Sequence, residues 1–475
     1  MAMGKRKKDQ QASLFVTHDE LPRTQGHPFY QRLNEIFAEE CFDGYVEKAC
    51  EPFYAKVMGR PGVPPGVYFR MFFVGYFEGI DSERGIAWRC ADSLSLRDFL
   101  GYGLSEKVPD HSSLSRTRRL IDVETHQEVF TWVLKVLGKS GLVKGKTVGI
   151  DATTLEANAA LRSIVNRATN ESYEDFLERL AKESGIETPT KPDIAKLDRK
   201  RKGKGSNKEW AHPHDPDARI TKMKDGRTHL AHKMETAVDM ETGVLLAVTV
   251  QDAVKGDTRS LIETMEASVD QMQALNEDPE TQDCGVEASS EEIVLDKGYH
   301  SNETLMFLSH DMQLRTYVSE PDRGPRKWKG KEEARDAVYA NRRRIRGERG
   351  KKLLRRRGEF LERPFAHCLE TGGMRRTHLR YHDNILKRLL VHTAGFNLSQ
   401  LMRRTTGIGK PRCLQGYLEA ILAKRTLTGG RKKTVAKVCM LTGFKLLKKI
   451  GQILFSRSPN SNSGFWLNPS FTTGC

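Results

Sequence analysis

Hydrophobic and polar residues follow two different spacings along the chain, and each spacing predicts a different kind of element. Residues 27–137 place apolar side chains at helical intervals, most densely in 68–80, so we predict a helical region there. Short β-branched and aliphatic runs in 146–160, 228–250 and 291–296 are typical of strands. The order of these patterns predicts an all-α region followed by a mixed α/β region.

Within the α/β region, the turn residues indicate how the strands are connected. Two strand-like runs flank Glu241-Thr242-Gly243, which predicts a hairpin over 228–250. Helices are predicted over 257–275 and 384–403, and the second has apolar residues spaced for burial. Residues 163–208 turn from acidic and helical to basic and polar, so we predict an insertion that lies outside the sheet.

These patterns divide the chain into four regions. We predict a basic flexible leader over 1–26, a helical N-terminal domain over 27–140, an α/β core over 141–404 with its insertion at about 163–208, and a basic tail over 405–475.

Charge narrows the class of partner. The net charge is +16, and residues 323–357 contain 16 Lys and Arg against four Asp and Glu. Such a run is either a solvated surface or a site for nucleic-acid phosphates, whose counterions are released on binding. The eight scattered cysteines form no Cys-x-x-Cys pair, no apolar run reaches the ~20 residues of a membrane span, and no signal peptide is evident. We therefore expect a soluble cytoplasmic protein.

A basic helix is predicted after the turn at Pro109 and Asp110. It carries Arg116, Arg118 and Arg119. A short turn before such a helix is what a helix-turn-helix DNA reader requires, although turns of this kind also occur in ordinary all-helical domains.

Each of two predicted strands has an aspartate in its C-terminal part or directly after it. Ile293, Val294 and Leu295 are followed by Asp296, and the strand through Ile150 reaches Asp151. A buried carboxylate is costly unless it is paired or bound to a metal, so each acid either caps a turn or holds a cation. Neighbouring strands lie about 4.8 Å apart, so the two carboxylates could share cations. Carboxylate oxygens suit Mg²⁺.

A third acid would complete a site for two-metal phosphodiester chemistry. The candidates are Glu359, Glu362 and Glu370. Arg355 and Arg363 stand four residues to either side of Glu359, which indicates ion pairing on a helix surface. Glu370 precedes a glycine pair and is placed at a helix end. We favour Glu362, whose neighbours Leu361 and Phe365 predict that it faces the core.

At this point several segments resemble a known family. The succession "GIDATTLEANAA", "DKGYHS", "LERPFAHCLETGGMRRTHLR" and "NILKRLLVHTAGFNL" is similar to the DDE transposases of bacterial insertion sequences, of the IS-four/IS-five type. The resemblance covers roughly residues 60–405 and includes the helical N-terminal domain. It implies that 27–140 is a DNA-binding domain and that 141–404 is the catalytic domain. It implies an RNase H-like core, a mixed sheet flanked by helices, in which Asp151, Asp296 and Glu362 bind Mg²⁺, with Mn²⁺ as a substitute.

The resemblance also has departures. Related enzymes often have Tyr and then Arg before the third acid and Lys seven residues after it, where this chain has Arg355, Gly358 and Leu369. Tyr299 and His300, in the element after Asp296, could touch DNA or stabilise the turn.

The resulting hypothesis is a transposase that binds terminal inverted repeats of double-stranded DNA, cleaves DNA and joins strands as a homodimer or higher oligomer. Two alternatives stay open: a nuclease of the same fold without strand transfer, and a DNA-binding relic without catalysis. Four arginines of the basic run complete the predicted DNA contacts: Arg342, Arg343, Arg344 and Arg346.

Overall fold

The computed structural model describes residues 26–55, 59, 62–201, 205–223, 226–322, 324 and 326–412. All of them belong to the first of two units into which the chain divides, residues 1–413. The predicted basic leader, up to residue 25, and the basic tail, from residue 413, lie outside the described residues.

The N-terminal part is helical, as the sequence predicted. Its elements are α1 (Pro28–Glu39), α2 (Phe42–Cys50), the short 3₁₀ turn η2 (Glu51–Phe53), α3 (Pro65–Glu78), α4 (Glu83–Asp92), α5 (Leu94–Leu100), α6 (His111–Leu120) and α7 (Val123–Lys139). The aromatic-rich α3 is buried on nearly every side, and its Phe73 packs against Phe37 and Phe42. This density of apolar rings supplies the core around which the other helices pack.

A mixed six-stranded sheet follows. Its strands are β1 (Thr147–Glu156), β4 (Arg219–Lys222), β5 (Thr228–Asp239), β6 (Leu245–Asp252), β7 (Glu292–Leu295) and β8 (Arg315–Val318). The order is β4-β5-β1-β7-β8, with β6 paired to the other half of β5. Strand β5 is antiparallel to β1, β4 and β6, whereas β1, β7 and β8 are parallel neighbours. The predicted hairpin is β5–β6.

One strand is longer than the sequence indicated. We predicted that Asp151 lies at the end part of its strand, but β1 continues to Glu156. The reason is its other neighbour: β5 pairs with β1 as far as Glu156, whereas the parallel pairing with β7 reaches only Ile150. Asp151 is therefore the first residue of β1 beyond the part paired with β7.

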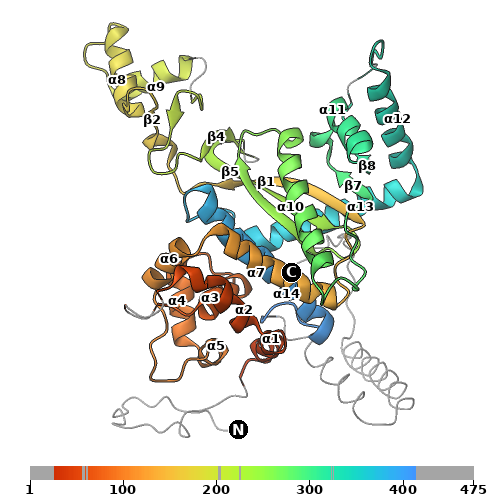
Figure 1. Cartoon of the computed structure of the whole chain (residues 1–475). Helices are drawn as coiled ribbons and strands as arrows, with labels where there is room; N and C mark the ends of the chain where they lie inside the picture. The colour runs from red at the N-terminus through yellow and green to blue at the C-terminus, as the bar shows by residue number, and fades with distance from the viewer. Residues whose placement is uncertain are drawn as a thin grey trace, which may run out of the picture. The chain divides into compact units, whose positions relative to one another are not determined.

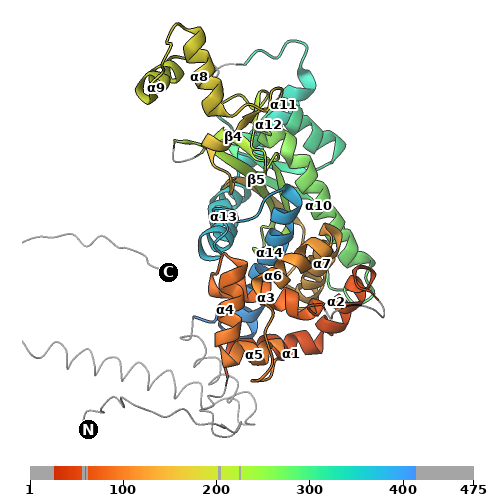
Figure 2. The same cartoon turned by 90° about the vertical axis from the view of Figure 1, so that its left-hand side faces the viewer.

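The helices that follow cover both faces of the sheet. They are α10 (Asp257–Glu277), η4 (Lys297–Tyr299), α11 (Asn302–Met306), the π-helical η5 (Phe307–Asp311), α12 (Glu332–Arg346), α13 (Glu348–Phe365), the π-helical η6 (Ala366–Thr371) and α14 (His382–Thr406). Figure 2 shows α10 and α13 on either side of β5. No helix of the described ranges is both long and apolar enough to cross a membrane.

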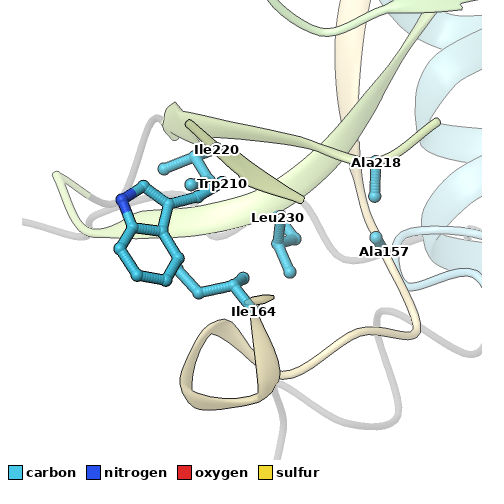
Figure 3. Close-up of a cluster of buried hydrophobic side chains, with 6 residues drawn as sticks. All are labelled: Ala157, Ile164, Trp210, Ala218, Ile220 and Leu230. Carbon is cyan, nitrogen blue, oxygen red and sulfur yellow. The ribbon is translucent and has the colours of Figure 1, made fainter. Parts of the chain in front are cut away.

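The segment predicted as an insertion lies outside the large sheet. Within the predicted bounds of 163–208 it contains β2 (Val165–Asn166), α8 (Tyr173–Glu183) and α9 (Lys191–Lys200), and it is flanked by η3 (Leu161–Ser163) and β3 (Trp210–Ala211). Strands β2 and β3 form a separate two-stranded sheet. Trp210 belongs to a small buried core with Ile164, Ile220 and Leu230 (Figure 3), so the segment is anchored on β4 and β5.

Helix α14 joins the helical region to the sheet. It packs against α3 and α7 and also against β6 (Figure 1). Asn397 of α14 accepts a hydrogen bond from the Leu245 backbone nitrogen (2.9 Å) and donates one to the Leu245 carbonyl oxygen (2.8 Å). Both backbone groups of this strand residue are thereby satisfied by a side chain. Packing therefore crosses the predicted boundary near residue 140.

A buried carboxylate ties α13 to the parallel strands. Glu292 of β7 is 1% exposed and accepts hydrogen bonds from Thr147 of β1, Tyr317 of β8 and Arg349 of α13. Burial alone would raise the pKa of Glu292, but the hydrogen bonds from Arg349 and Thr147 outweigh it and lower the pKa from its ordinary value. This part of the basic run therefore has a structural role.

Removing that cation should destabilise the fold. We expect Arg349→Ala to lower the free energy of unfolding by about 2 kcal/mol, because a buried carboxylate loses its charged donor. A carboxyl whose pKa is lowered by folding gives stability above its unfolded pKa of about 4.3 and loses it as the pH falls. In urea titrations at pH 7 and pH 4, the stability difference between parent and variant should therefore shrink at pH 4. Lys351→Ala, which removes an exposed pair with Glu348, is the control and should change little; an equal loss in both variants would contradict the account.

Candidate functional site

Asp151 and Asp296 lie on either side of one guanidinium group. Arg357 of α13 places one terminal nitrogen 3.4 Å from Asp151 Oδ2 and the other 3.3 Å from Asp296 Oδ1. The Asp151 and Asp296 side chains are 19% and 38% exposed, so both remain accessible from solvent. The two predicted carboxylates are thus brought together in one site.

The parallel pairing of β1 and β7 produces this arrangement. Ile150 is paired with Leu295, so the next residue of each chain segment is an aspartate. Both acids therefore lie directly beyond the part of β1 and β7 that is paired, at the same end and at neighbouring positions. As the sequence predicted, Asp296 follows its strand directly.

Helix α13 lies over the same face as Asp151. Side chains alternate along a strand, so Gly149 and Asp151 share a face, opposite to that of Ile150. A Cβ atom on Gly149 would come within 3.1 Å of Leu361 Cδ2 and 2.6 Å of Met240 Sδ, so a glycine lets the helix approach β1 closely. Arg357 stands one helical turn before Leu361 and reaches the aspartates from that position.

The chemistry of this site is that of a cation held between two carboxylates. Two negative charges at such short range repel each other, and a positive group between them offsets the repulsion. In this structure the guanidinium fills that place. Hard carboxylate oxygens on a partly exposed edge also suit Mg²⁺, which keeps water ligands and binds only a few carboxylates. Asp151 and Asp296 therefore fit a divalent cation.

The third acid does not join this pair in the structure. Glu362 is exposed, so the prediction that it faces the core was wrong; Leu361 and Phe365 are the residues that point inward. Over the described ranges, no three His, Cys, Asp or Glu side chains lie close enough to hold an ion together. The assignment of Glu362 stays a prediction.

The other two candidates have surface partners. Glu359 pairs with Arg363 at 2.7 Å, which confirms the expected ion pair on the helix surface. Glu370 lies in η6, next to the end of the helical segment, and pairs with Arg375. Neither arrangement directs these carboxylates to Asp151.

Tyr299, which could have touched DNA or stabilised the turn, is an interior residue. Its ring is 1% exposed and its hydroxyl donates to Glu235 Oε1 at 2.7 Å. His300 is equally buried. Burial of both residues favours the structural interpretation of the turn after Asp296.

The predicted DNA-binding arginines of α6 divide into two kinds. Arg118 is 7% exposed, pairs with Glu83 at 2.8 Å and donates to Asn384 of α14 at 2.6 Å. Arg116 and Arg119 are exposed. We therefore leave Arg118 out of the surface that could meet DNA, because its guanidinium already joins α6 to α4 and α14.

The turn before α6 differs from the predicted short turn. Asp110 caps α6 by accepting from the Ser113 backbone nitrogen, and hydrogen bonds from Ser113 and Ser112 lower the pKa of this carboxyl. However, α5 ends at Leu100, and residues 101–110 separate the two helices. The short connection, Ile121 and Asp122, instead follows α6 and leads into α7.

The arginines of α12 divide in the same way. Arg342 forms a two-pronged ion pair with Glu320 at 2.6 and 2.8 Å. Arg344 donates to the Thr316 carbonyl, and burial lowers the pKa of its guanidinium. Arg343 and Arg346 are exposed, and neither has an ion-pair partner among the residues that the structure describes. Of the four, these two are placed to meet an external anion.

Sequence reasoning missed Arg357 as a site residue, because it stood within a long basic run. A signal was present: Leu353 and Leu361 lie four residues to either side of it and predict one buried helix face. Arg357 is the basic residue on that face. Glu235 was missed as well, since nothing near it in the sequence distinguishes it from other strand residues.

Comparison with known proteins gives one finding for the N-terminal part. A family model described as "Transposase domain (DUF772)" matches residues 16–120. This segment spans about a fifth of the chain and, among the described residues, contains α1 to α6. Searches of curated proteins and of solved structures returned no match. The similarity supports a transposase.

Arg118 and Arg119 of α6 differ in their surroundings: Arg118 is buried and paired, whereas Arg119 is exposed. We expect Arg118→Ala to lower the free energy of unfolding by about 3 kcal/mol, because Glu83 is left in a largely buried position without its partner. Arg119→Ala should change stability by less than about 0.5 kcal/mol. Thermal or urea unfolding of the two purified variants measures this difference. Equal stability of both would contradict the assigned role of Arg118.

Proposed function

We propose that this protein is a DDE-type DNA transposase of the IS-four/IS-five kind, with an RNase H-like core, that binds terminal inverted repeats, cleaves DNA and joins strands. The observation that carries the proposal is the placement of Asp151 and Asp296 on either side of one cation, directly after the last residues that pair β1 with β7. The match of residues 16–120 to a transposase domain supports the same class. A mixed sheet covered on both faces by helices is compatible with an RNase H-like core.

The proposed cofactor is Mg²⁺, with Mn²⁺ as a substitute. Asp151 and Asp296 would hold it, and Glu362 is our proposed third ligand. When bound, two such ions would activate a water or a 3′-hydroxyl and stabilise the leaving oxygen of a phosphodiester. For Glu362 to take part, α13 has to turn or shift relative to the sheet, since this side chain is exposed in the structure.

The protein's own groups would orient the DNA. Exposed basic residues on α12 and α13 lie on the elements that lead to Arg357: Arg343, Arg346, Lys352 and Arg355. Such side chains would contact DNA phosphates and would not distinguish one base from another. Exposed Arg116 and Arg119 on α6 would contribute to recognition of the repeats. We further propose that the protein works as a homodimer or larger oligomer on DNA.

A catalytically inactive DNA-binding protein is the second candidate. The observation that favours it is that Glu362 is exposed and that three acidic ligands are not assembled in the described part of the chain. A nuclease without strand transfer would use the same site, and the structure does not favour it over the transposase.

The direct test supplies linear DNA that carries the flanking repeats and asks for Mg²⁺-dependent cleavage at their ends. Precut ends offered with a target DNA then test joining. Cleavage with joining supports the transposase, cleavage alone indicates the nuclease, and DNA binding without cleavage indicates the relic.

Single substitutions should separate the proposed ligands from their neighbours. We expect Asp151→Ala, Asp296→Ala and Glu362→Ala each to abolish cleavage and joining while DNA binding is kept, because a metal ligand is lost. Glu359→Ala is the matched control on the same helix and should retain most activity, since it loses only a surface pair worth a few tenths of a kcal/mol. Gel assays of cleavage and of DNA binding measure both properties.

Two outcomes would correct this assignment. If Glu359→Ala is inactive and Glu362→Ala is active, Glu359 is the third acid in place of Glu362. Parent-like activity in all four variants would place catalysis elsewhere.

The basic surface makes a separate prediction about binding. We expect the double change Arg343→Ala and Arg346→Ala to weaken binding to any DNA sequence and to reduce the slope of log affinity against log salt by roughly two units, one for each lost phosphate contact. Arg342→Ala, which breaks the pair with Glu320, should leave that slope nearer the parent value. Filter binding or fluorescence anisotropy over a salt series gives the slopes. An unchanged slope in the double variant would indicate that these two arginines are solvated and do not contact DNA phosphates.

A further inference from the structure

A buried polar network lies behind the turn that carries Asp296. Its centre is Glu235 of β5, whose side chain is 0% exposed. Three hydroxyl groups donate to this carboxylate: Ser260 at 2.7 Å, Thr264 at 2.5 Å and Tyr299 at 2.7 Å. Two of the donors belong to α10 and the third to η4, directly after Asp296. A buried carboxylate with this many donors is well satisfied and holds its partners in one geometry.

A second buried charge extends the network. Lys233, two residues before Glu235 on β5, is 4% exposed. Its ammonium group donates to Asp257 at 2.6 Å and to Ser260 at 2.8 Å, and it lies 4.0 Å from Glu235. Burying a lysine and a glutamate costs several kcal/mol before their mutual attraction is counted. Because side chains alternate along a strand, Lys233 and Glu235 point to the face of the sheet opposite to that of Asp151, whose partner on β5 is Thr236.

The network holds the Asp296 turn at two points. Tyr299 is fixed through its hydroxyl to Glu235. Gly298 lies against Asp257: a Cβ atom there would come within 2.4 Å of Asp257 Oδ2. Only a glycine can approach this carboxylate so closely. Asp257 is in turn held by Lys233, so both points of attachment lead back to β5.

The same stretch of β5 also fixes Asp151. Thr236 is the backbone partner of Asp151 in the antiparallel pairing, and Glu235 is the partner of Ala152. Asp151 is therefore located by the main chain of β5, and Asp296 by side chains from the adjacent positions of β5. Strand β5 therefore helps to hold both acids in the positions that the pairing of β1 with β7 gives them.

Tyr299 is chemically suited to this task as a hydrogen-bond donor. Burial and the charge of Glu235 raise the pKa of the phenol far above its ordinary value, so the hydroxyl keeps its proton and remains a donor. The ring is enclosed, which restricts it to one orientation.

We propose that Glu235, acting through Tyr299, is a positioning residue that fixes Asp296 at the spacing from Asp151 that a divalent cation requires. The inference rests on the proposed function, in that the two aspartates are taken to hold a divalent cation. Groups that orient metal ligands from behind commonly change metal affinity 10- to 100-fold when they are lost. The position of a metal ligand on a short turn depends more on such supporting groups than that of a ligand within a paired strand.

The test compares two hydroxyls on the same carboxylate. Tyr299→Phe removes the donor that carries the Asp296 turn, and Thr264→Val removes a donor from α10, to the other oxygen of Glu235. Mn²⁺ binding to the full chain without DNA is followed by electron paramagnetic resonance, and thermal unfolding is recorded in parallel. We expect both variants to lose stability, but only Tyr299→Phe to weaken Mn²⁺ binding, by about tenfold. DNA affinity in the absence of metal should be that of the parent in both.

Three results would overturn the proposal: parent-like Mn²⁺ affinity in Tyr299→Phe, an equal loss of affinity in Thr264→Val, or parent Mn²⁺ binding that Asp296→Ala does not reduce. The proposed function fails separately. If repeat DNA is not cleaved but Tyr299→Phe alone weakens Mn²⁺ binding, the positioning role stands without the transposase; if repeat DNA is cleaved and both variants bind Mn²⁺ equally, the transposase stands without the positioning role.

Discussion

Two carboxylates at neighbouring positions, directly beyond the paired part of two parallel strands, repel each other, and a positive group between them offsets this repulsion. Parallel pairing of β1 with β7 brings Asp151 and Asp296 to the same end of the sheet, and α13 brings Arg357 between them. Gly149 allows α13 to lie close enough for this contact. An arginine in this place stabilises the site without a metal, and it also means that a divalent cation has to displace a guanidinium that the chain itself supplies.

The rest of the structure holds these groups in place from two sides. On one face of the sheet, α10 and the turn after Asp296 are attached to β5 through buried hydroxyl, carboxylate and ammonium groups. At the edge of the sheet, α14 satisfies the backbone of β6 through Asn397 and packs against α3 and α7. The N-terminal helices and the sheet with the aspartates are therefore one packed body, and the hydrogen bond from Arg118 to Asn384 links α6 directly to α14.

Local patterns predicted the elements well, and predicted the direction of individual side chains less well. The run Ile293–Leu295 before Asp296, the hairpin around Gly243 and the buried helix through Leu389 all follow from short-range spacing, and the structure has them. The extension of β1 to Glu156 depends on β5, about 80 residues later in the sequence, and no local signal carries it. Glu362 was expected to face inward because Leu361 and Phe365 do, yet neighbouring positions on a helix differ by about 100° and point elsewhere. Arg118 shows the same limit, since its partners Glu83 and Asn384 come from distant segments.

The central claim is that Asp151 and Asp296 form the cation site of this protein. The most direct measurement is a crystal structure of the full chain soaked with Mn²⁺, with anomalous scattering recorded at the manganese edge. The account predicts an anomalous peak between the two carboxylates, with the Arg357 guanidinium moved out of that position. A peak elsewhere, or no peak while Arg357 still bridges Asp151 and Asp296, would contradict it.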